Sequence, residues 1–143
     1  MTVYLSSMIS MRGHPFGKAE NGRKICIVDD DEAVRDSLKV LLESHGHEVS
    51  DFASPLDLLA TDTLSHCDCL IIDQHMPAMS GVELVEVLRA KDVAVPTLMV
   101  TGRPDCALIE RLGQAGRCSL YAKPVSDEVL LDGIARALAA PIH

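Results

Sequence analysis

The sequence predicts an α/β protein built as a doubly wound, five-stranded parallel sheet with five helices. Three observations predict this fold. Short segments rich in Val, Ile and Leu recur five times, a helical pattern of apolar residues follows each of them, and the chain of 143 residues is long enough to bury one core. Apolar strands that alternate with helices are typical of a parallel sheet that is covered on both faces.

Each strand is predicted from a short run of residues between two helical patterns. The expected strands are 24–28, 47–53, 69–73, 95–101 and 119–123. The first, third and fourth are nearly continuous apolar runs, as expected for strands that are buried on both faces. The second is weaker because charged residues interrupt it, and the last is short.

The helices are predicted from apolar spacing and from the residues at their ends. They are expected at 31–46, 54–64, 80–91, 104–116 and 126–139. The first helix places on one face Val34, Leu38, Leu41, Leu42 and His45, and it ends at Gly46. The second begins with Ser54 as N-cap and Pro55 at the first helical position.

The last three helices follow the same logic. The third has a stripe formed by Val82, Val85, Leu88 and Arg89, and the fourth ends at Gly116. The fifth carries Leu130, Ile134 and Leu138 on one stripe, with Ser126 or Asp127 as its cap. These stripes are explained as core contacts and need no cofactor.

The chain divides into a short extension and one domain. Residues 1–23 contain glycine and proline without periodicity and are expected to be a flexible N-terminal extension, whereas 24–143 form the domain. The first residues do not make a signal peptide, and no apolar run approaches the roughly eighteen residues of a membrane span. The chain has five cysteines, an odd number, and three of them lie in or beside apolar runs, which favours reduced thiols and a cytoplasmic protein.

The charge of the chain argues against one class of partner. The net charge is −8, and residues 1–23 contribute three basic side chains against one acidic, so the rest of the chain carries −10. An acidic domain is a poor surface for phosphates of nucleic acids. We therefore expect no direct binding of nucleic acid by this chain and no membrane contact, but cation binding fits the composition.

Charged and hydroxyl side chains end four of the predicted strands. Asp29 and Asp30 close the first, Asp73 the third, Thr101 the fourth and Lys123 the fifth. Ligands of open parallel sheets bind outside the carboxyl ends of the strands, so these side chains are expected to share one site. For any single one of them a solvated loop residue is the simpler interpretation, but this is not so for all five.

The chemistry of these residues points to a phosphoryl group. Carboxylates that lie close together raise one another's pKa values unless a cation neutralises them, and a cluster of oxygen ligands suits Mg²⁺. Lys123 adds a positive charge and Thr101 a hydroxyl donor. An aspartate can itself accept a phosphoryl group, and Asp73, at the end of a central strand, is the expected acceptor.

From about residue 24 to 140 the chain resembles the receiver domain of two-component response regulators, which has a flavodoxin-like fold. Four motifs carry the resemblance, and they are "IVDDDEAVRDSL", "LIIDQHMPAMSGVEL", "PTLMVTGRPD" and "YAKPVSDEVL". Asp73 follows Asp30 by 43 residues, Thr101 follows Asp73 by 28, and Lys123 follows Thr101 by 22, so the spacing matches as well as the content.

The resemblance implies a role for each of these residues. Asp73 would accept a phosphoryl group from a histidine kinase or a histidine phosphotransfer protein, Thr101 would move to bond its oxygens, and Lys123 would pair with its charge. Mg²⁺ would be held by Asp29, Asp30, Asp73 and the backbone carbonyl of His75. Pro77 and Gly81 would shape the loop after the acceptor, and the Lys123–Pro124 peptide would be cis.

The sequence departs from the family at the aromatic switch position. The family usually has Tyr or Phe three residues before the lysine, and here Leu120 occupies that place. Tyr121 is one residue later and should point to the opposite face of its strand. Either Leu120 cannot act as the switch, or a local shift brings Tyr121 round, and the first interpretation is favoured.

Two further residues, His75 and Arg103, lie two positions after Asp73 and Thr101. They are either solvent-facing loop residues or side chains that tune the lifetime of the acyl phosphate by controlling attacking water. "SHCDC" (65–69) invites a zinc interpretation, which is rejected because no second ligand pair lies nearby.

The expected function is transmission of a phosphoryl signal by protein contacts of the fourth helix, fifth strand and fifth helix, about 104–139. The output partner is unknown, and a homodimer is left open. Alternatives are the N-terminal receiver of a longer DNA-binding transcriptional regulator, a receiver taken from a hybrid kinase, a degenerate receiver that only binds, and a phosphohydrolase. The last is disfavoured because His75 stands where such an enzyme needs a carboxylate.

Overall fold

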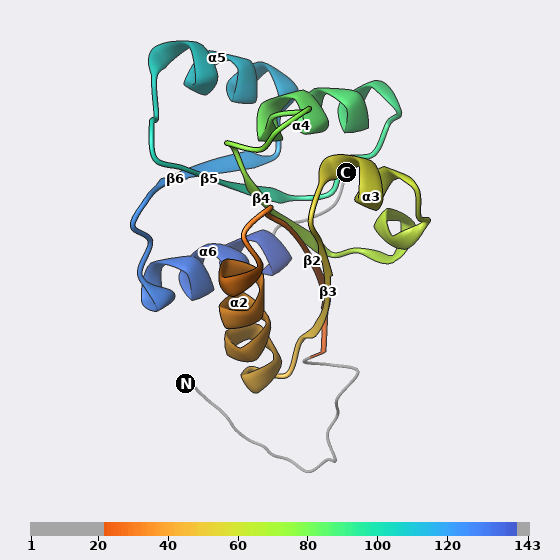
Figure 1. The fold of residues 1–143 in the computed structure, drawn as a ribbon, viewed down its shortest axis with the longest axis vertical. Helices are drawn as coiled ribbons and strands as arrows, with labels where there is room; N and C mark the ends of the chain where they lie inside the picture. Colours follow the sequence, from red (N-terminus) through yellow and green to blue (C-terminus); the bar gives the residue numbers. More distant parts are fainter. Residues whose placement is uncertain (1–21, 140–143) are drawn as a thin grey trace.

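A computed structural model of the chain describes residues 22–139, and in it five parallel strands alternate with helices (Figure 1). The strands are β2 (Lys24–Val28), β3 (Glu48–Phe52), β4 (Cys69–Asp73), β5 (Thr97–Thr101) and β6 (Cys118–Ala122). The helices are α2 (Glu32–Ser44), α3 (Pro55–Leu59), α4 (Gly81–Ala90), α5 (Cys106–Ala115) and α6 (Asp127–Ala139), with a short 3₁₀ helix, η1 (Thr63–His66). The predicted fold is confirmed. Apart from Gly22 and Arg23, the expected N-terminal extension lies outside the described residues.

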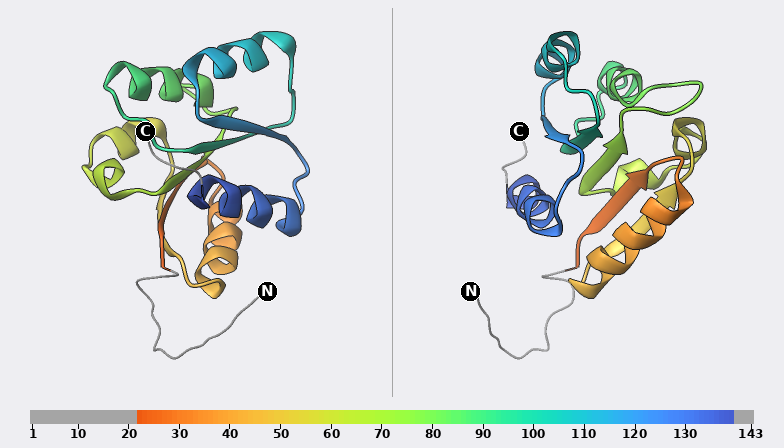
Figure 2. Two further views of the ribbon diagram at one scale, coloured as in Figure 1. Left: turned by 180° about the vertical axis from the view of Figure 1, so that it is seen from behind. Right: turned by 60° about the vertical axis from the view of Figure 1, so that its left-hand side comes forward.

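The sheet has the order β3-β2-β4-β5-β6, and every pair is parallel. Helices α2 and α6 cover one face and α3, α4 and α5 the other, so the sheet is doubly wound (Figures 1 and 2). The chain leaves β2 toward β3 and then returns to the other side of β2 with β4. The switch in direction therefore falls between β2 and β4, where open α/β sheets bind ligands.

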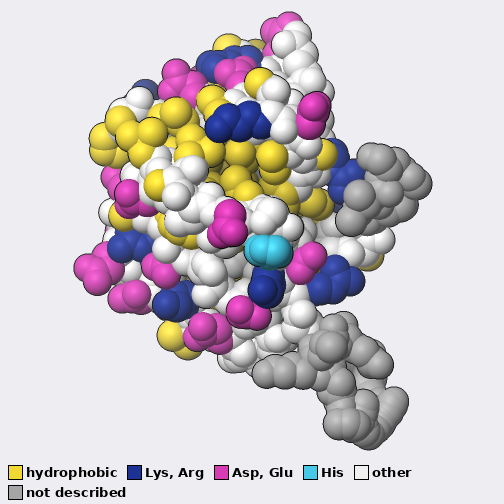
Figure 3. Space-filling view, turned by 90° about the vertical axis from the view of Figure 1, so that its right-hand side faces the viewer, with side chains coloured by type: hydrophobic (Ala, Val, Ile, Leu, Met, Phe, Trp, Pro, Cys, Tyr) yellow, Lys and Arg dark blue, Asp and Glu magenta, His cyan; other side chains and the backbone are white. Residues whose placement is uncertain are grey.

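Two apolar layers hold the helices to the sheet. Between the sheet and α3, α4 and α5 the largest buried side chains include Leu58, Leu84, Leu88 and Met99. Between the sheet and α2 and α6 they include Ile25, Ile27, Leu42 and Ile134. Figure 3 shows the side of the molecule where α3 and α4 lie, with hydrophobic side chains gathered on it. Within residues 22–139, no helix has the length and apolarity that a membrane crossing requires.

Several boundaries differ from the prediction for physical reasons. The helix expected at 54–64 ends at Leu59, because the Thr61 hydroxyl bonds to the Leu58 carbonyl at 2.8 Å and turns the chain before η1. The strand expected from residue 95 begins at Thr97, after Pro96, which has no N–H to donate to a neighbouring strand. His45 is not on the core face of its helix; it is exposed and forms the C-cap of α2.

Arg89 also differs from the apolar stripe that was expected to include it. Its guanidinium group is partly buried and donates hydrogen bonds to backbone carbonyls, among them Val93 at 2.8 Å and Gly116 at 2.9 Å. The side chain therefore joins the end of α4 to the loop before β5 and to the turn before β6.

Candidate functional site

Three aspartates meet where β2 and β4 end, as the sequence predicted for the carboxyl edge. One carboxylate oxygen from each of Asp29, Asp30 and Asp73 lies within 4.8 Å of the others. Asp29 and Asp73 are 6% and 5% exposed, whereas Asp30 is exposed. Among residues 22–139 this is the only group of three or more His, Cys, Asp or Glu side chains close enough to hold a metal ion.

Asp29 is fixed in place from two sides. Its side-chain Oδ1 accepts a hydrogen bond from the Asp31 N–H at 2.9 Å, and its carbonyl accepts one from the Arg35 guanidinium at 2.8 Å. Arg35 in turn donates through Nε to Asp51 Oδ2 at 3.1 Å, in a largely buried ion pair. Sequence reasoning missed Arg35, because its acidic partner lies on β3, 16 positions away.

Asp31 does a different job from its two neighbours. It is the N-cap of α2, and its carboxylate accepts hydrogen bonds from the N–H groups of Ala33 and Val34. A carboxylate at this position satisfies free helix N–H groups and interacts favourably with the helix dipole. The run of three aspartates is therefore divided between a polar site and a helix cap.

Lys123 reaches Asp73 from the end of β6. Its Nζ lies 2.7 Å from Asp73 Oδ1, and its side chain is 43% exposed. The strand positions it through a hydrogen bond from its N–H to the Thr101 carbonyl at 2.8 Å, and the Lys123–Pro124 peptide is cis as expected. Burial lowers the pKa of Lys123, but the hydrogen bond to Asp73 and the charges of Asp73, Asp29 and Asp30 outweigh it, so the pKa is raised.

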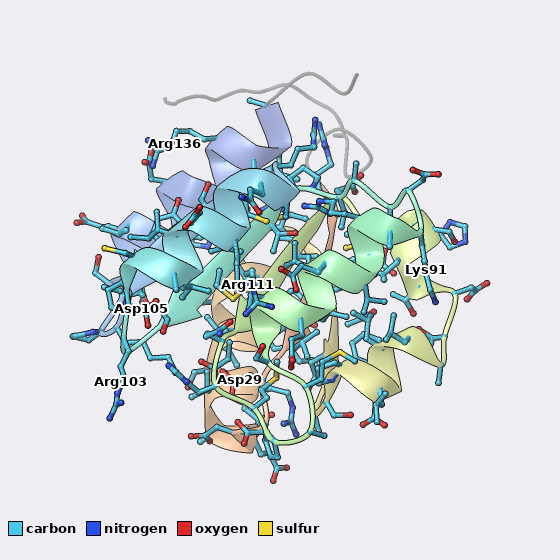
Figure 4. The ribbon with its side chains drawn as sticks, turned by 90° about the horizontal axis from the view of Figure 1, so that it is seen from above. Asp29, Lys91, Arg103, Asp105, Arg111 and Arg136 are labelled. Atoms are coloured by element: carbon cyan, nitrogen blue, oxygen red, sulfur yellow. The ribbon has the colours of Figure 1, made fainter. Side chains whose placement is uncertain are left out.

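Thr101 is fully buried at the end of β5, and its hydroxyl already has two partners. Oγ1 accepts the Arg103 N–H at 3.0 Å and lies 3.0 Å from Nε2 of the His75 ring. The structure therefore joins His75 to Thr101 across 26 positions, a contact that no sequence pattern indicates. The Arg103 side chain is exposed and points away from Asp29 (Figure 4).

The loop after Asp73 is held tightly against the sheet. The Gly81 N–H donates to the Gln74 carbonyl at 3.0 Å, and the Val82 N–H donates to the Gln74 side-chain oxygen at 2.8 Å. A Cβ atom on Gly81 would lie 2.8 Å from the Asp73 carbonyl oxygen and 2.6 Å from Met99 Sδ. Only glycine lets α4 begin this close to Asp73. Pro77 is exposed in the same loop.

The electrostatics of the cluster favour a bound cation. Burial raises the pKa of Asp29, a hydrogen bond from the Asp31 backbone opposes this, and the charge of Asp73 adds to the increase. A buried carboxylate beside two others is costly unless positive charge compensates it, and Lys123 is a single cation against three anions. The all-oxygen donor set fits Mg²⁺, which binds through a few carboxylates and retains water molecules.

An apolar cavity of about 440 Å³ opens beside this cluster, between α2 and α6. Asp29, Asp73 and Lys123 form its polar end, and its apolar lining includes Val34 and Val125. The side chain of Val34 is 37% exposed. Asp73 is thus bordered by apolar side chains as well as by charges.

Leu120 and Tyr121 lie on opposite faces of β6. Leu120 packs against the apolar layer under α4 and α5, and Tyr121 belongs to the layer under α6. The Tyr121 ring lies against Gly133 of α6, where an added Cβ atom would overlap its hydroxyl group. No local shift brings Tyr121 to the face of Leu120, so an aliphatic side chain occupies the switch position.

Comparisons with known proteins agree with this geometry. A family model described as the response regulator receiver domain matches residues 25–135. The C4-dicarboxylate transport transcriptional regulatory protein DctR of Rhodobacter capsulatus is 38% identical over 116 residues, which are 80% of this chain and 59% of that protein. The transcriptional regulatory protein FixJ of Rhizobium meliloti is 35% identical over 111 residues, 78% of this chain and 54% of that protein.

Solved structures show the same fold. The structure of FixJ-N has a TM-score of 0.73 and 32% identity, and the match covers 85% of this chain and 97% of that one. Vibrio cholerae chemotaxis protein CheY4 has a TM-score of 0.74 and 29% identity, with 81% of this chain and 98% of that one covered. The chain spans 50% to 59% of the length of the curated relatives that it matches most strongly.

Proposed function

Because this chain belongs to the response regulator receiver family, we propose that Asp73 is the residue that accepts the phosphoryl group of a two-component signal. The observation that carries the proposal is the position of Asp73. It ends the central strand β4, lies 2.7 Å from the Lys123 ammonium and shares one cluster with Asp29 and Asp30. At this position a cation bound by Asp29 and Asp30, together with the Lys123 ammonium, would stabilise the negative charge of a phosphoryl group that is transferred to Asp73.

The reaction proposed is transfer from a phosphohistidine of a kinase or a phosphotransfer protein. A carboxylate oxygen of Asp73 forms the new bond to phosphorus while the bond from phosphorus to the donor's imidazole nitrogen breaks. The nitrogen keeps the bonding electron pair and takes up a proton. Lys123 balances the charge of the phosphoryl oxygens, and the Thr101 hydroxyl donates to one of them after it leaves its partner His75.

We propose Asp29, Asp30, Asp73 and the backbone carbonyl of His75 as ligands of Mg²⁺. Bound Mg²⁺ supplies positive charge that offsets the repulsion of the carboxylates and of the incoming phosphoryl group. The raised pKa of Asp29 supports this assignment, because it reflects a carboxylate whose ionised form lacks sufficient compensation within the protein alone.

The donor protein is proposed to dock beside the acceptor, over α2 and the loop after Lys123. The exposed Val34 and the apolar cavity that reaches Asp73 provide contact surface there. Phosphorylation is proposed to change the protein contacts made by the surface of α5, β6 and α6. A homodimer formed through this surface is one such contact. Free thiols at all five cysteines, which lie within 22–139, fit the proposed cytoplasmic location.

His75 and Arg103 are proposed to tune how long the acyl phosphate persists. The support differs between the two. His75 contacts the Thr101 hydroxyl directly, whereas the Arg103 side chain points away and contributes its backbone N–H. Dephosphorylation rates of His75→Ala and Arg103→Ala test this, and we expect the larger change for His75→Ala. Unchanged rates in both variants would remove the proposal.

The central experiment is incubation with acetyl phosphate and Mg²⁺ followed by intact-mass measurement. Wild-type protein should gain the mass of one phosphoryl group, and neither Asp73→Asn nor wild-type protein in excess EDTA should gain it. Asp68→Asn, a change directly before the opposite end of β4 that keeps an oxygen for the Lys24 N–H, is the control and should be modified like wild type. Wild-type protein that stays unmodified would indicate a degenerate receiver that acts only by binding.

A second candidate is that this chain serves as the receiver of a longer transcriptional regulator. The relatives that match it include proteins named as transcriptional regulatory proteins, and the chain spans little more than half of their length. Immunoblotting of the native protein in its source cells tests this. A band near 15.4 kDa supports a receiver that acts by itself, and a band about twice as large supports the regulator. A much larger membrane-bound band would indicate a hybrid kinase.

A further inference from the structure

A cavity of about 480 Å³ lies at the edge of the sheet opposite the aspartates. It is bordered by the first residues of β5 and β6, by the turn before β6 and by the second half of α6, and we call it the amino-edge cavity. Figure 4 shows Arg136, which lines this cavity, and Asp29, which belongs to the aspartate cluster, toward opposite ends of the view. The proposed phosphoryl chemistry uses no residue of the amino-edge cavity.

Small side chains on two facing elements leave this space unfilled. Ser119 and Tyr121 are two residues apart on β6, so both point to the face of the sheet that α6 covers. Gly133 and Ala137 are four residues apart on α6, so they lie on one face of that helix, and both line the cavity. The Tyr121 hydroxyl lies against Gly133, where an added Cβ atom would overlap it. Larger residues at these positions would close the cavity.

Positive charge and hydrogen-bond donors line the amino-edge cavity. Arg117 precedes β6 and Arg136 lies on α6, so guanidinium groups come from two different walls. The hydroxyl groups of Ser119 and Tyr121 add neutral donors from the strand. None of the described residues that line the cavity is acidic, although residues 24–143 carry a net charge of −10. The cavity therefore favours an anion in a domain that is otherwise acidic.

Two of these donors are available to a ligand. Arg136 pairs with Asp132 at 2.8 Å, but the two side chains are 70% and 65% exposed, and exposed pairs of this kind contribute little to stability. The five N–H donors of a guanidinium group also exceed what one carboxylate accepts. Within residues 22–139, no side chain or backbone group forms a hydrogen bond with the Tyr121 hydroxyl. An anion in the cavity would give both groups a partner.

The shape and chemistry of the cavity distinguish between anions. A phosphate monoester carries up to two negative charges and three terminal oxygens around one phosphorus atom, so it can use donors from both walls at once. A carboxylate is planar and has one charge and two oxygens. Pro96 and Ala137 add apolar wall beside the donors. A volume of this size is typical of sites for small molecules.

We propose that the amino-edge cavity binds a small organic phosphate. Its phosphate group is held by Arg117, Arg136 and the Tyr121 hydroxyl, and its organic part lies against Pro96 and Ala137. The site is separate from the aspartate cluster and requires neither Mg²⁺ nor phosphorylation of Asp73. Its test can therefore fail or succeed independently of the proposed function.

The experiment is titration of the ¹⁵N-labelled full chain with phenyl phosphate in EDTA at neutral pH, followed by amide chemical shifts. We expect saturable shifts at Ser119, Gly133 and Ala137, with a Kd of about 1 mM. Benzoate and inorganic phosphate should each bind about fivefold or more weakly, because one lacks the phosphate and the other the apolar part. Equal affinity for benzoate or for inorganic phosphate would overturn the ligand class. Shifts that do not saturate by about 20 mM, or that centre on Asp29 and Asp73, would overturn the site.

Four variants assign the contacts, and their melting temperatures report whether each one is folded. Arg136→Gln should weaken binding of phenyl phosphate about tenfold, and Tyr121→Phe about three- to tenfold. Asp132→Asn, which releases Arg136 from its ion pair, should strengthen binding about twofold, an effect that damage to the fold cannot produce. Arg111→Gln is the matched control, because it removes the same charge from α5 outside the cavity (Figure 4). Equal weakening by Arg111→Gln and Arg136→Gln would show attraction by net charge alone and overturn the proposal.

Discussion

Replacing Gly81 by alanine tests the closest approach in the site. The new Cβ atom would lie 2.6 Å from Met99 Sδ, 2.8 Å from the Asp73 carbonyl oxygen and 3.0 Å from Ile72 Cγ2. The methionine side chain can move, but the carbonyl belongs to β4 and cannot move without the strand. Extra atoms in a packed core cost about 1–3 kcal/mol.

The gain in helix propensity offsets part of this cost. Alanine is better than glycine in a helix interior by about 0.8–1 kcal/mol, and less at the first helical position, which Gly81 occupies. We therefore expect Gly81→Ala to lower the free energy of unfolding by about 1–2 kcal/mol. In a domain of this size that is a decrease in melting temperature of roughly 3–10 °C.

Gly113→Ala in α5 is the matched control. The same atom added there meets nothing within 4 Å, and the position is exposed, so propensity alone decides and stability should rise by about 0.5–1 kcal/mol. The chain has no tryptophan, so urea and thermal unfolding are best followed by far-UV circular dichroism. A Gly81→Ala protein as stable as Gly113→Ala would refute the close approach of α4 to Asp73.

Three further predictions concern charged groups. Asp31→Ala should lower the free energy of unfolding by about 1 kcal/mol through loss of the helix cap and leave phosphorylation intact. Asp30→Ala should abolish Mg²⁺-dependent phosphorylation. Equal effects of the two variants in unfolding and intact-mass assays would show that the two aspartates share one role. Arg89→Ala should lower the free energy of unfolding of the protein by about 2–4 kcal/mol, because it leaves several backbone carbonyls without a hydrogen-bond partner. Urea unfolding measures this, and a decrease below about 1 kcal/mol would contradict the prediction. In EDTA, Asp29→Asn should be more stable than wild type at neutral pH and gain nothing from Mg²⁺. The folded-state pKa of Asp29 is raised above its ordinary value of 3.8, so the stability of the wild-type protein falls as the pH rises through the window above 3.8. This fall should be smaller in Asp29→Asn, which has no carboxylate to ionise at that position. Identical pH profiles of the melting temperature in the two proteins would contradict the prediction.

The positions of the site residues were predictable because they depend on strand direction alone. In a parallel sheet every carboxyl end faces one edge, so Asp29, Asp73, Thr101 and Lys123 had to meet once the strands were identified. The role of Asp31 as a cap was predictable for a similar reason, since an aspartate before an apolar helical pattern satisfies the first N–H groups.

The contacts that stabilise the site were not predictable, because they join residues from different elements. Arg35 looks like any charged helix residue until β3 brings Asp51 to it, and Arg89 looks like part of an apolar stripe until two loops present their carbonyls. The break after α3 has a local cause, the Thr61 hydroxyl, but threonine occurs in many unbroken helices. Its effect depends on the hydrogen bond to Leu58, which is decided by the fold.

The replacement at the switch position changes what the output surface can present. Leu120 lies beside Met99 in the ladder, under α4 and α5, and has no hydroxyl group that could gain or lose a hydrogen bond when Thr101 moves. Tyr121 cannot substitute for it, because its ring is held against Gly133 of α6 on the other face. In the proposed function, movement of Thr101 would therefore reach α5 through packing of aliphatic side chains. We expect the two states of this receiver to differ in apolar contacts at α5 and β6, rather than in the exposure of an aromatic ring.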